Sequence, residues 1–483
     1  MSQFNRNQIM NLDKLLKPSS LAVVGASIKP EKVGNVILKN LKEGEFRLYP
    51  VNPKEKEILG LRCYPNLSSL PEIPDVAILA VAATTSLPIT AECARLGVPF
   101  VIIVAGGFAE IGSEGRSIQD QMLQVIQGSD TRLLGPNTMG VIIPKIKLDT
   151  LFLPKERSPR PKQGSIALIS QSGSVMVGLY ESAEDAHVGL GACVGIGNKA
   201  DLSENDFLEY FGKDQETKCI SFYLESFSSG RHFADCARKI SHRKPIVAAK
   251  VGNTPSAQKA ALSHTGALAS GTDLMIKGVF HQSGIIRVDD DQDLLDISQA
   301  LSCLDHLKGN RIAIVGSGGG YGVVATDYVT SEANGFGLRL ASLSEEAKQS
   351  LKKLSPYFAS VNNPVDLTGD VTNKMYDEVL AVLEGEKEID AILLILLFQP
   401  PGMTMEMVDI AEKWAKNGSK PTVFCCTGGG FSRPILQRLN ERGIPAYGSI
   451  RRSVHALGSL WERGRFLGGI EGEAAKDTKG FRP

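Results

Sequence analysis

The amino-acid sequence predicts an α/β protein built from three doubly wound domains, each formed around a parallel sheet. Strand-like and helical patterns alternate from one end of the chain to the other, which is typical of parallel strands joined by crossover helices. In three places, at 21–27, 166–173 and 312–322, an apolar strand runs into a turn rich in Gly or Ser and then into a helical pattern. Each of these places can begin a separate domain, and 483 residues are enough for two to four domains.

Two polar stretches separate these starting points. The first, 154–164, is rich in Pro and charge, and the second, 303–310, ends in a turn signal. We therefore predict domains at 1–155, 163–303 and 308–470.

The composition excludes several classes of protein. Lys plus Arg and Asp plus Glu both number 53, so charge gives no reason to expect a nucleic acid or a membrane surface as partner. We find no apolar run of about 18 residues and no apolar signal core at the N-terminus, and we expect a cytoplasmic protein. The eight Cys have no C-x-x-C spacing, so buried reduced thiols are expected and no metal site is predicted from them.

The first predicted domain offers two anion-binding turns. The turn at 25–34 lacks the G-x-G-x-x-G pattern of dinucleotide sites, but it leads into a helix N-terminus and carries Lys29 and Lys32. The run at 49–54 places Lys54 just after a strand. No acidic residue closes that second strand, which argues against NAD. Each turn could equally be a structural βα connection.

In the second predicted domain, polar residues follow several strands. They are the Ser-Gln-Ser-Gly run at 170–173, Asn198, Glu225 and His264. Because the carboxyl ends of parallel strands share one edge of a sheet, we expect these residues to converge. A carboxylate bonded to one ring nitrogen of His264 would leave the other nitrogen free as a nucleophile. The alternatives are a solvated strand-end carboxylate and a surface histidine.

The third predicted domain resembles a flavodoxin-like sheet. It has a Gly-rich turn at 316–322 and a continuous apolar run at 391–398, as expected for a strand buried on both faces. We predict a packing or interface domain without chemistry of its own. Asp366 and Asp370 could bind a metal, but a single turn cluster is weak evidence.

Taken together, these motifs resemble those of the α subunits of NDP-forming acyl-CoA synthetases, relatives of succinyl-CoA synthetase. The resemblance covers about 10–465, and the order and spacing of the motifs make it specific. The motifs are Gly25-Ala26-Ser27 with Lys32-Val33-Gly34, Val51-Asn52-Pro53-Lys54, Leu134-Gly135-Pro136-Asn137, Ser170-Gln171-Ser172-Gly173, Gly197-Asn198-Lys199-Ala200-Asp201, Tyr223-Leu224-Glu225, Ser263-His264-Thr265-Gly266 and Asn363-Pro364-Val365-Asp366.

The resemblance implies a Rossmann-like CoA-binding domain followed by two flavodoxin-like domains. It implies that His264 is the residue that is phosphorylated and that Glu225 steadies it. The implied phosphate-binding residues are Ser170, Gln171, Ser172 and Gly173. The implied CoA-binding residues are Gly25, Ala26, Ser27, Lys32, Val33, Gly34, Pro53, Lys54 and Asn137.

The implied reaction converts acyl-CoA and phosphate into acyl phosphate and CoA. The histidine then passes the phosphoryl group to ADP, giving ATP and the free acid. An ATP-grasp module for ATP/ADP (or GTP/GDP) and Mg²⁺ has no room in this chain, so the resemblance implies a separate β subunit in an α2β2 complex. The alternatives are a CoA-binding regulatory protein and an acyl or carbamoyl transferase without nucleotide turnover. The sequence does not name the acyl group.

Overall fold

The computed structural model describes residues 12–254, 256–257 and 273–479, and it confirms an α/β protein with parallel sheets. The described residues fall into two compact units. The first lies within Met1–Glu181, Leu190–Ile240 and Ala248–Ser283. The second lies within Ser182–Gly189, Ser241–Val247 and Gly284–Pro483. None of the described helices is both long enough and apolar enough to cross a membrane.

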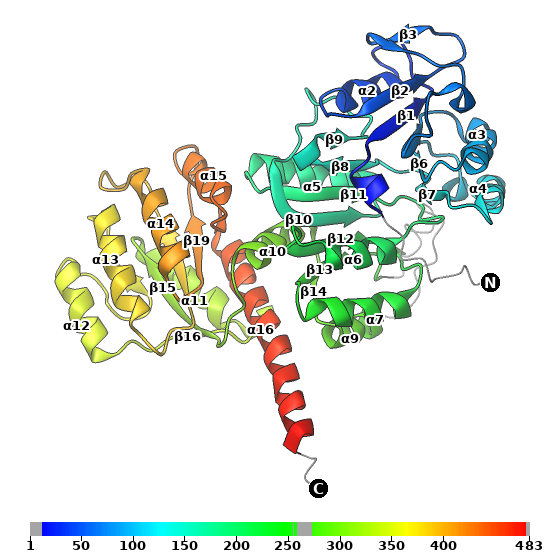
Figure 1. The fold of residues 1–483 in the computed structure, drawn as a ribbon. Coiled ribbons are helices and arrows are strands. Elements are labelled where there is room, and N and C mark those ends of the chain that lie inside the picture. Colours follow the sequence, from blue (N-terminus) through cyan, green and yellow to red (C-terminus); the bar gives the residue numbers. More distant parts are fainter. Residues whose placement is uncertain (1–11, 255, 258–272, 480–483) are drawn as a thin grey trace. The chain divides into compact units, whose positions relative to one another are not determined.

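The first sheet has five parallel strands with helices on both faces. In pairing order they are β2 (Arg47–Val51), β1 (Ser20–Val24), β5 (Val76–Leu79), β6 (Phe100–Ile103) and β7 (Arg132–Leu134). Helices α3 (Ala83–Leu96) and α4 (Ser113–Ile126) pack side by side on one face, and α2 (Val33–Leu41) lies on the other (Figure 1). Every residue of β1, β5 and β6 is buried, because helices cover both faces. A short hairpin, β3 (Glu57–Ile58) and β4 (Leu61–Arg62), follows β2.

The second sheet has seven strands. In pairing order they are β14 (Ile285–Val288), β13 (Ile246–Lys250), β12 (Cys219–Leu224), β10 (Gln163–Ser170), β11 (Leu190–Gly195), β8 (Val141–Ile143) and β9 (Leu148–Asp149). Its helices are α5 (Gly173–Asp185), α6 (Glu204–Lys213), α7 (Gly230–Ser241), α9 (Asp273–Gln282) and α10 (Asp291–Cys303). From β10 to β14 the strand order is that of a flavodoxin-like sheet. The chain therefore reverses its direction of winding at β10 and β12, which is where such sheets place ligands.

Strands β8 and β9 depart from the purely parallel sheet that we predicted. Strand β8 pairs antiparallel with β11, and β9 pairs antiparallel with β8. These strands precede residue 155, yet they extend the second sheet and cover what would be an open edge at β11. The polar stretch at 154–164 is also packed, since Arg160 Nε donates to the buried Asp149 at 2.9 Å. The predicted domain boundary stays a prediction.

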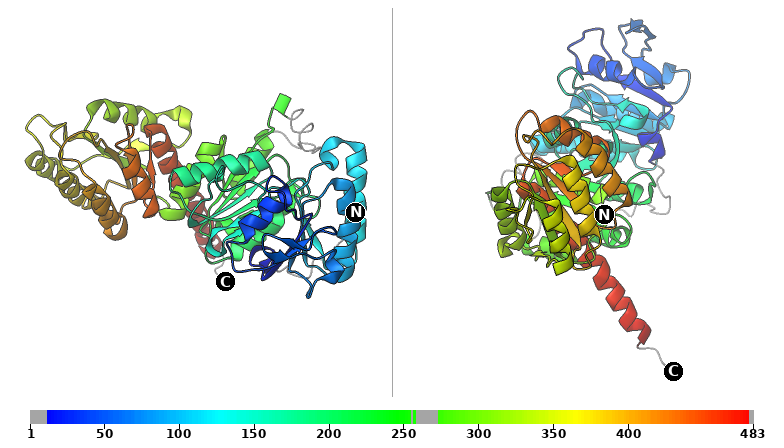
Figure 2. Two further views of the ribbon diagram at one scale, coloured as in Figure 1. Left: turned by 90° about the horizontal axis from the view of Figure 1, so that it is seen from above. Right: turned by 90° about the vertical axis from the view of Figure 1, so that its left-hand side faces the viewer.

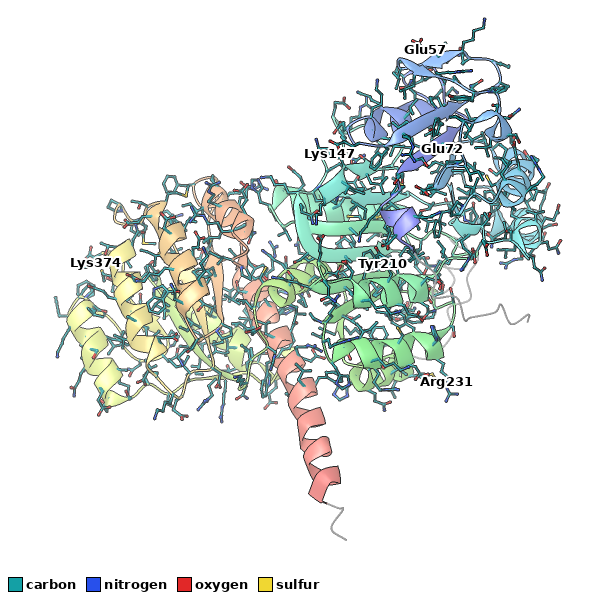
Figure 3. The ribbon with its side chains drawn as sticks, viewed as in Figure 1. Glu57, Glu72, Lys147, Tyr210, Arg231 and Lys374 are labelled. Atoms are coloured by element: carbon teal, nitrogen blue, oxygen red, sulfur yellow. The ribbon has the colours of Figure 1, made fainter. Side chains whose placement is uncertain are left out.

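Contacts in the first unit also tie α1 (Asp13–Leu16) to α6. Tyr210, labelled in Figure 3, lies on α6, and its hydroxyl bonds to Oδ1 of Asp13 at 2.7 Å. Burial and the Asp13 carboxylate raise the pKa of Tyr210, so its hydroxyl keeps its proton and acts as a donor.

The third sheet is also flavodoxin-like in strand order. In pairing order its strands are β16 (Arg339–Leu340), β15 (Arg311–Gly316), β18 (Ala391–Leu396), β19 (Thr422–Cys426) and β20 (Ala446–Tyr447), with β17 (Val365–Asp366) also paired to β15. Its helices are α11 (Gly319–Thr330), α12 (Glu345–Leu354), α13 (Asn373–Glu384), α14 (Glu406–Asn417), α15 (Arg433–Glu441) and α16 (Ile450–Lys479). Helices α12 to α14 form one layer and α11 and α16 lie on the other side of the sheet (Figures 1 and 2). The fully buried run at 391–396 confirms the strand expected there.

The glycine at position 34 permits a close backbone contact in the first domain, and this contact can be tested. A Cβ at Gly34, on α2, would lie 2.2 Å from the backbone oxygen of Gly25, whereas a Cβ at the exposed Gly178, on α5, would meet nothing within 4 Å. We expect Gly34→Ala to lower the free energy of unfolding by about 1–3 kcal/mol through overpacking. The matched Gly178→Ala should raise it by about 0.5–1 kcal/mol, because Ala favours a helix. Urea titration of both variants checks this, and equal effects would contradict the packing.

Candidate functional site

The turn after β1 is held in a shape that only small residues allow. Gly25 has φ +84°, and a Cβ there would lie 2.5 Å from the backbone oxygen of Ala80, after β5. A hydrogen bond from the loop after β2 also holds this turn, because Asn52 Nδ2 donates to the backbone oxygen of Ala26 at 2.7 Å. Strand β1 lies between β2 and β5, so this turn stands at the point where the direction of winding reverses.

The predicted CoA-binding residues divide into two groups in the structure. Ala26 and Gly34 are buried and shape the turn. Lys32, Val33, Pro53, Lys54 and Asn137 are exposed, and Gly25 and Ser27 are half-buried. Lys32 is the residue before α2, so it lies at the positive end of that helix. This arrangement suits an anionic ligand, and the CoA contacts themselves stay a prediction.

Loops from the first and second sheets meet at a cluster of amide and carboxylate groups. Asn137 has φ +56°, and its side-chain Nδ2 donates to Oδ1 of Asn198 at 3.4 Å. Asn198 Nδ2 donates in turn to Glu110 Oε2 at 2.5 Å and to Gln119 Oε1 at 3.2 Å. The sequence predicted Asn198 beside Glu225, but its side-chain hydrogen bonds run to the first domain. Sequence reasoning missed Glu110, whose only local signal is the Gly106-Gly107 turn before it.

The charge of Glu110 is stabilised by donors on both sides. Burial opposes ionisation, but hydrogen bonds from Asn198 and from the backbone N–H groups of Phe108 and Gly107 lower the pKa of Glu110 below its usual value. A carboxylate that stays ionised therefore stands where the two domains meet.

The Ser-Gln-Ser-Gly run at 170–173 forms the connection from β10 to α5. Ser170 is fully buried, and its hydroxyl donates to the backbone oxygen of Ser172 at 2.7 Å. The Ser172 hydroxyl accepts from the N–H of Val175 at 3.4 Å, in the manner of a helix cap. The serine side chains thus build the turn, and the helix N-terminus at Gly173 is the part suited to an anion. Phosphate binding by these four residues stays a prediction.

Gln171 joins this turn to the end of the neighbouring strand. Its side-chain Oε1 accepts from the N–H groups of Glu225 and Ser226, at 3.0 and 3.1 Å. Its Nε2 donates to the Ser226 hydroxyl at 3.2 Å. Glu225 is 6% exposed and follows β12 directly. The structure therefore brings the 170–173 turn and Glu225 together, as the sequence predicted.

A buried ion pair lies beneath the segment that follows Glu225, and sequence reasoning gave it no role. Lys199 Nζ donates to Glu204 Oε2 at 3.0 Å and to the Ser226 backbone oxygen at 2.7 Å. Lys199 lies within the 197–201 motif. That motif was identified from the sequence, but the contacts of the Lys199 side chain were not predicted. The motif also holds Asp201, which receives a bidentate pair from Arg132 of β7.

The predicted nucleophile, His264, lies outside the described residues. Its convergence with Glu225 is accordingly a prediction. Asp366, suggested as a metal ligand, accepts from the N–H of Thr368 at 3.0 Å. Among the residues that the structure describes, no group of three or more His, Cys, Asp or Glu side chains is arranged to hold a metal ion.

Family models match most of the chain. Residues 19–144 match a CoA binding domain, 163–301 a succinyl-CoA ligase like flavodoxin domain, and 312–468 a ligase-CoA domain. The three matches follow the order that the motifs implied.

Individual relatives match more than nine tenths of the chain. The alpha subunit of ADP-forming acetate–CoA ligase I from Pyrococcus furiosus is 37% identical, over 94% of this chain and 98% of its own length. ADP-forming acetate–CoA ligase I from Archaeoglobus fulgidus is 36% identical over 93% of this chain but only 63% of its own length. A dinucleotide-forming acetyl-coenzyme A synthetase 1 from Ca. Korarchaeum cryptofilum, solved with phosphate and ADP, has a TM-score of 0.86 at 33% identity and covers 96% of this chain and 99% of its own. On these grounds the chain belongs to the alpha subunits of the ADP-forming acyl-CoA synthetases.

Proposed function

We propose that this chain catalyses the acyl and phosphohistidine steps by which acyl-CoA, phosphate and ADP become a carboxylic acid, CoA and ATP, and the reverse steps. The observation that carries the proposal is the link made by Gln171 between the start of α5 and the strand end at Glu225. It fixes a helix N-terminus, which favours an anion, beside a buried carboxylate.

The reaction divides into three displacements. Phosphate attacks the thioester carbon, the C–S bond breaks, and CoA leaves as acyl phosphate forms. A ring nitrogen of His264 attacks the phosphorus, the P–O bond to the acyl group breaks, and the carboxylate leaves. The terminal oxygen of ADP then takes the phosphoryl group from His264, which forms ATP.

The chain contributes mainly positioning and electrostatics to these steps, as phosphoryl transfer requires. Glu225 accepts a hydrogen bond from one ring nitrogen of His264 and so leaves the other nitrogen free to attack. The N-terminus of α5 stabilises the charge of the transferred group. Lys32 and Lys54 hold the phosphates of CoA at the turns after β1 and β2.

The proposed nucleotide site and its Mg²⁺ belong to an ATP-grasp β subunit, in an α2β2 complex. The name of the Pyrococcus relative, a subunit alpha, supports a partner chain. The greater length of the Archaeoglobus relative is consistent with a partner that is fused in some members. We place the complex in the cytoplasm, where CoA, nucleotides and carboxylic acids are metabolised together.

A small monocarboxylic acid such as acetate is the proposed substrate. Relatives that match more than nine tenths of the chain are named for acetate, 4-hydroxybutyrate and trans-feruloyl-CoA, whose acyl groups all come from monocarboxylic acids. The acyl group should lie where the first and second domains meet, and there the ionised Glu110 disfavours a second carboxylate on the substrate. The regulatory protein and the transferase are not favoured, since the matching relatives are ligases.

Phosphorylation of His264 is the first testable consequence. The chain is incubated with its β subunit, Mg²⁺ and ATP labelled in the terminal phosphate. We expect acid-labile label on His264 and none in His264→Ala. The matched control is His232→Ala, because His232 is a surface residue paired with Glu209 and should leave labelling unchanged. Undiminished labelling of His264→Ala would overturn the proposed nucleophile.

Loss of a lysine at the β1 turn should weaken CoA binding. We expect Lys32→Ala to remove a charge-assisted phosphate contact of about 1.5–3 kcal/mol, so that the Kd for CoA rises about tenfold to a hundredfold. Lys39→Ala is the control, because Lys39 lies in the last turn of the same helix and pairs with Glu156. Isothermal titration with CoA makes the comparison. Equal affinity of both variants for CoA would show that Lys32 is a solvated surface residue that makes no phosphate contact.

A further inference from the structure

Lys199 is a buried lysine at the centre of the candidate site. Its side chain is 4% exposed, and that of its partner Glu204, the first residue of α6, is fully buried. Its Nζ reaches both Glu204 and the backbone oxygen of Ser226. Lysines are seldom buried to this degree unless they are paired.

Glu204 also holds the segment after β12, at Ser228, two residues beyond the contact of Lys199. Its Oε1 accepts from the N–H of Ser228 at 2.6 Å, and its Oε2 lies 3.3 Å from the Ser228 hydroxyl. Gln171 holds the N–H groups of Glu225 and Ser226 from the other side. The segment 225–228 is therefore fixed at three successive points, and Lys199 supplies the middle one.

Stability alone does not explain a lysine here. Burial lowers the pKa of Lys199, and the carboxylates of Glu204 and Glu225 only partly offset this effect. Buried ion pairs are often no more stabilising than apolar side chains of the same volume. A methionine at position 199 and a glutamine at position 204 could fill the same space. An ammonium at position 199 is therefore explained by the geometry that its hydrogen bonds impose on the neighbouring segment.

The backbone on both sides of Lys199 is tied to the first domain. The N–H of Asn198 donates to the oxygen of Pro136, and the N–H of Ala200 donates to the oxygen of Gly135, each at 3.0 Å. Lys199 itself has φ +55°, which turns its side chain away from these contacts and toward β12. One residue thus has its backbone at the loop predicted to meet CoA and its ammonium at the segment after Glu225.

We infer that Lys199 is a positioning residue for phosphoryl transfer, which fixes the segment after Glu225 relative to the 135–137 loop. The inference rests on the proposed function, because it assumes that Glu225 orients a phosphorylated histidine. The contacts of Lys199 Nζ are with Glu204 and the Ser226 backbone oxygen, so its role in transfer is assigned as indirect. It acts through Ser226 and Glu204, so its loss should affect the phosphoryl-transfer rate and leave CoA affinity intact.

A pair of variants separates positioning from stability. Lys199→Met leaves Glu204 as an unpaired buried charge, whereas Lys199→Met with Glu204→Gln removes both charges and keeps a side-chain oxygen for the Ser228 N–H. Both are assembled with the β subunit, and three quantities are measured: the melting temperature, the Kd for CoA, and the single-turnover rate of His264 phosphorylation by labelled ATP and Mg²⁺.

We expect the melting temperature to fall in Lys199→Met and to recover in the double variant. The phosphorylation rate should fall about tenfold to a hundredfold in both, which is the loss of one charge-assisted hydrogen bond. The Kd for CoA should stay within about twofold of wild type. A double variant that recovers the wild-type rate would reduce Lys199 to a structural residue. Wild-type enzyme that takes no label would instead overturn the proposed function, so the two failures are distinguishable.

Discussion

The candidate site depends on how the chain leaves β12. A strand that ends inside the protein must find hydrogen-bond partners for its next backbone groups, because buried polar groups without partners are strongly destabilising. Here the side chains of Gln171, Lys199 and Glu204 supply these partners for the segment 225–228. Gln171 comes from the connection after β10, and both Lys199 and Glu204 come from the connection after β11, so these two connections and the segment after β12 are fixed relative to one another by one set of side-chain contacts. Glu225 begins that segment, and its backbone N–H is held by Gln171.

The same edge of the second sheet is joined closely to the first domain. A Cβ at Gly197 would lie 2.3 Å from the backbone oxygen of Pro136, so only glycine lets these two loops approach so closely. Arg132, on β7, makes a bidentate pair with Asp201, which also accepts from the N–H of Leu133 at 2.8 Å. The loops predicted to bind CoA and a phosphoryl group can therefore keep a fixed separation, which reaction between two such sites would require.

Much of the fold could be predicted from the sequence, because it follows from local patterns. Apolar strands ending in small or polar turns marked β1, β10 and β15, and the continuous apolar run at 391–398 identified β18. The antiparallel β8 and β9 were missed because strands of two or three residues leave too little periodicity to detect. The pairing of these strands is decided by the open edge of β11, a tertiary constraint.

The strand ends that form the candidate site could be predicted from the sequence, but the side-chain contacts that join them could not. The turn at 170–173 and Glu225 were expected together because parallel strands share an edge. The roles of Gln171, Lys199 and Glu110 depend on side-chain direction between distant loops, which neither composition nor spacing specifies. Asn198 shows the same limit, since it turns toward Glu110 and Gln119.

Glu225 is proposed to orient His264 for phosphoryl transfer at the α5 N-terminus. Phosphorus-31 NMR of the assembled enzyme after mixing with ATP and Mg²⁺ tests it most directly, with wild type compared with Glu225→Gln. We expect a phosphohistidine resonance that forms rapidly in wild type and at least about tenfold more slowly in the variant, at unchanged affinity for CoA. A resonance that forms at the same rate in both proteins would contradict it.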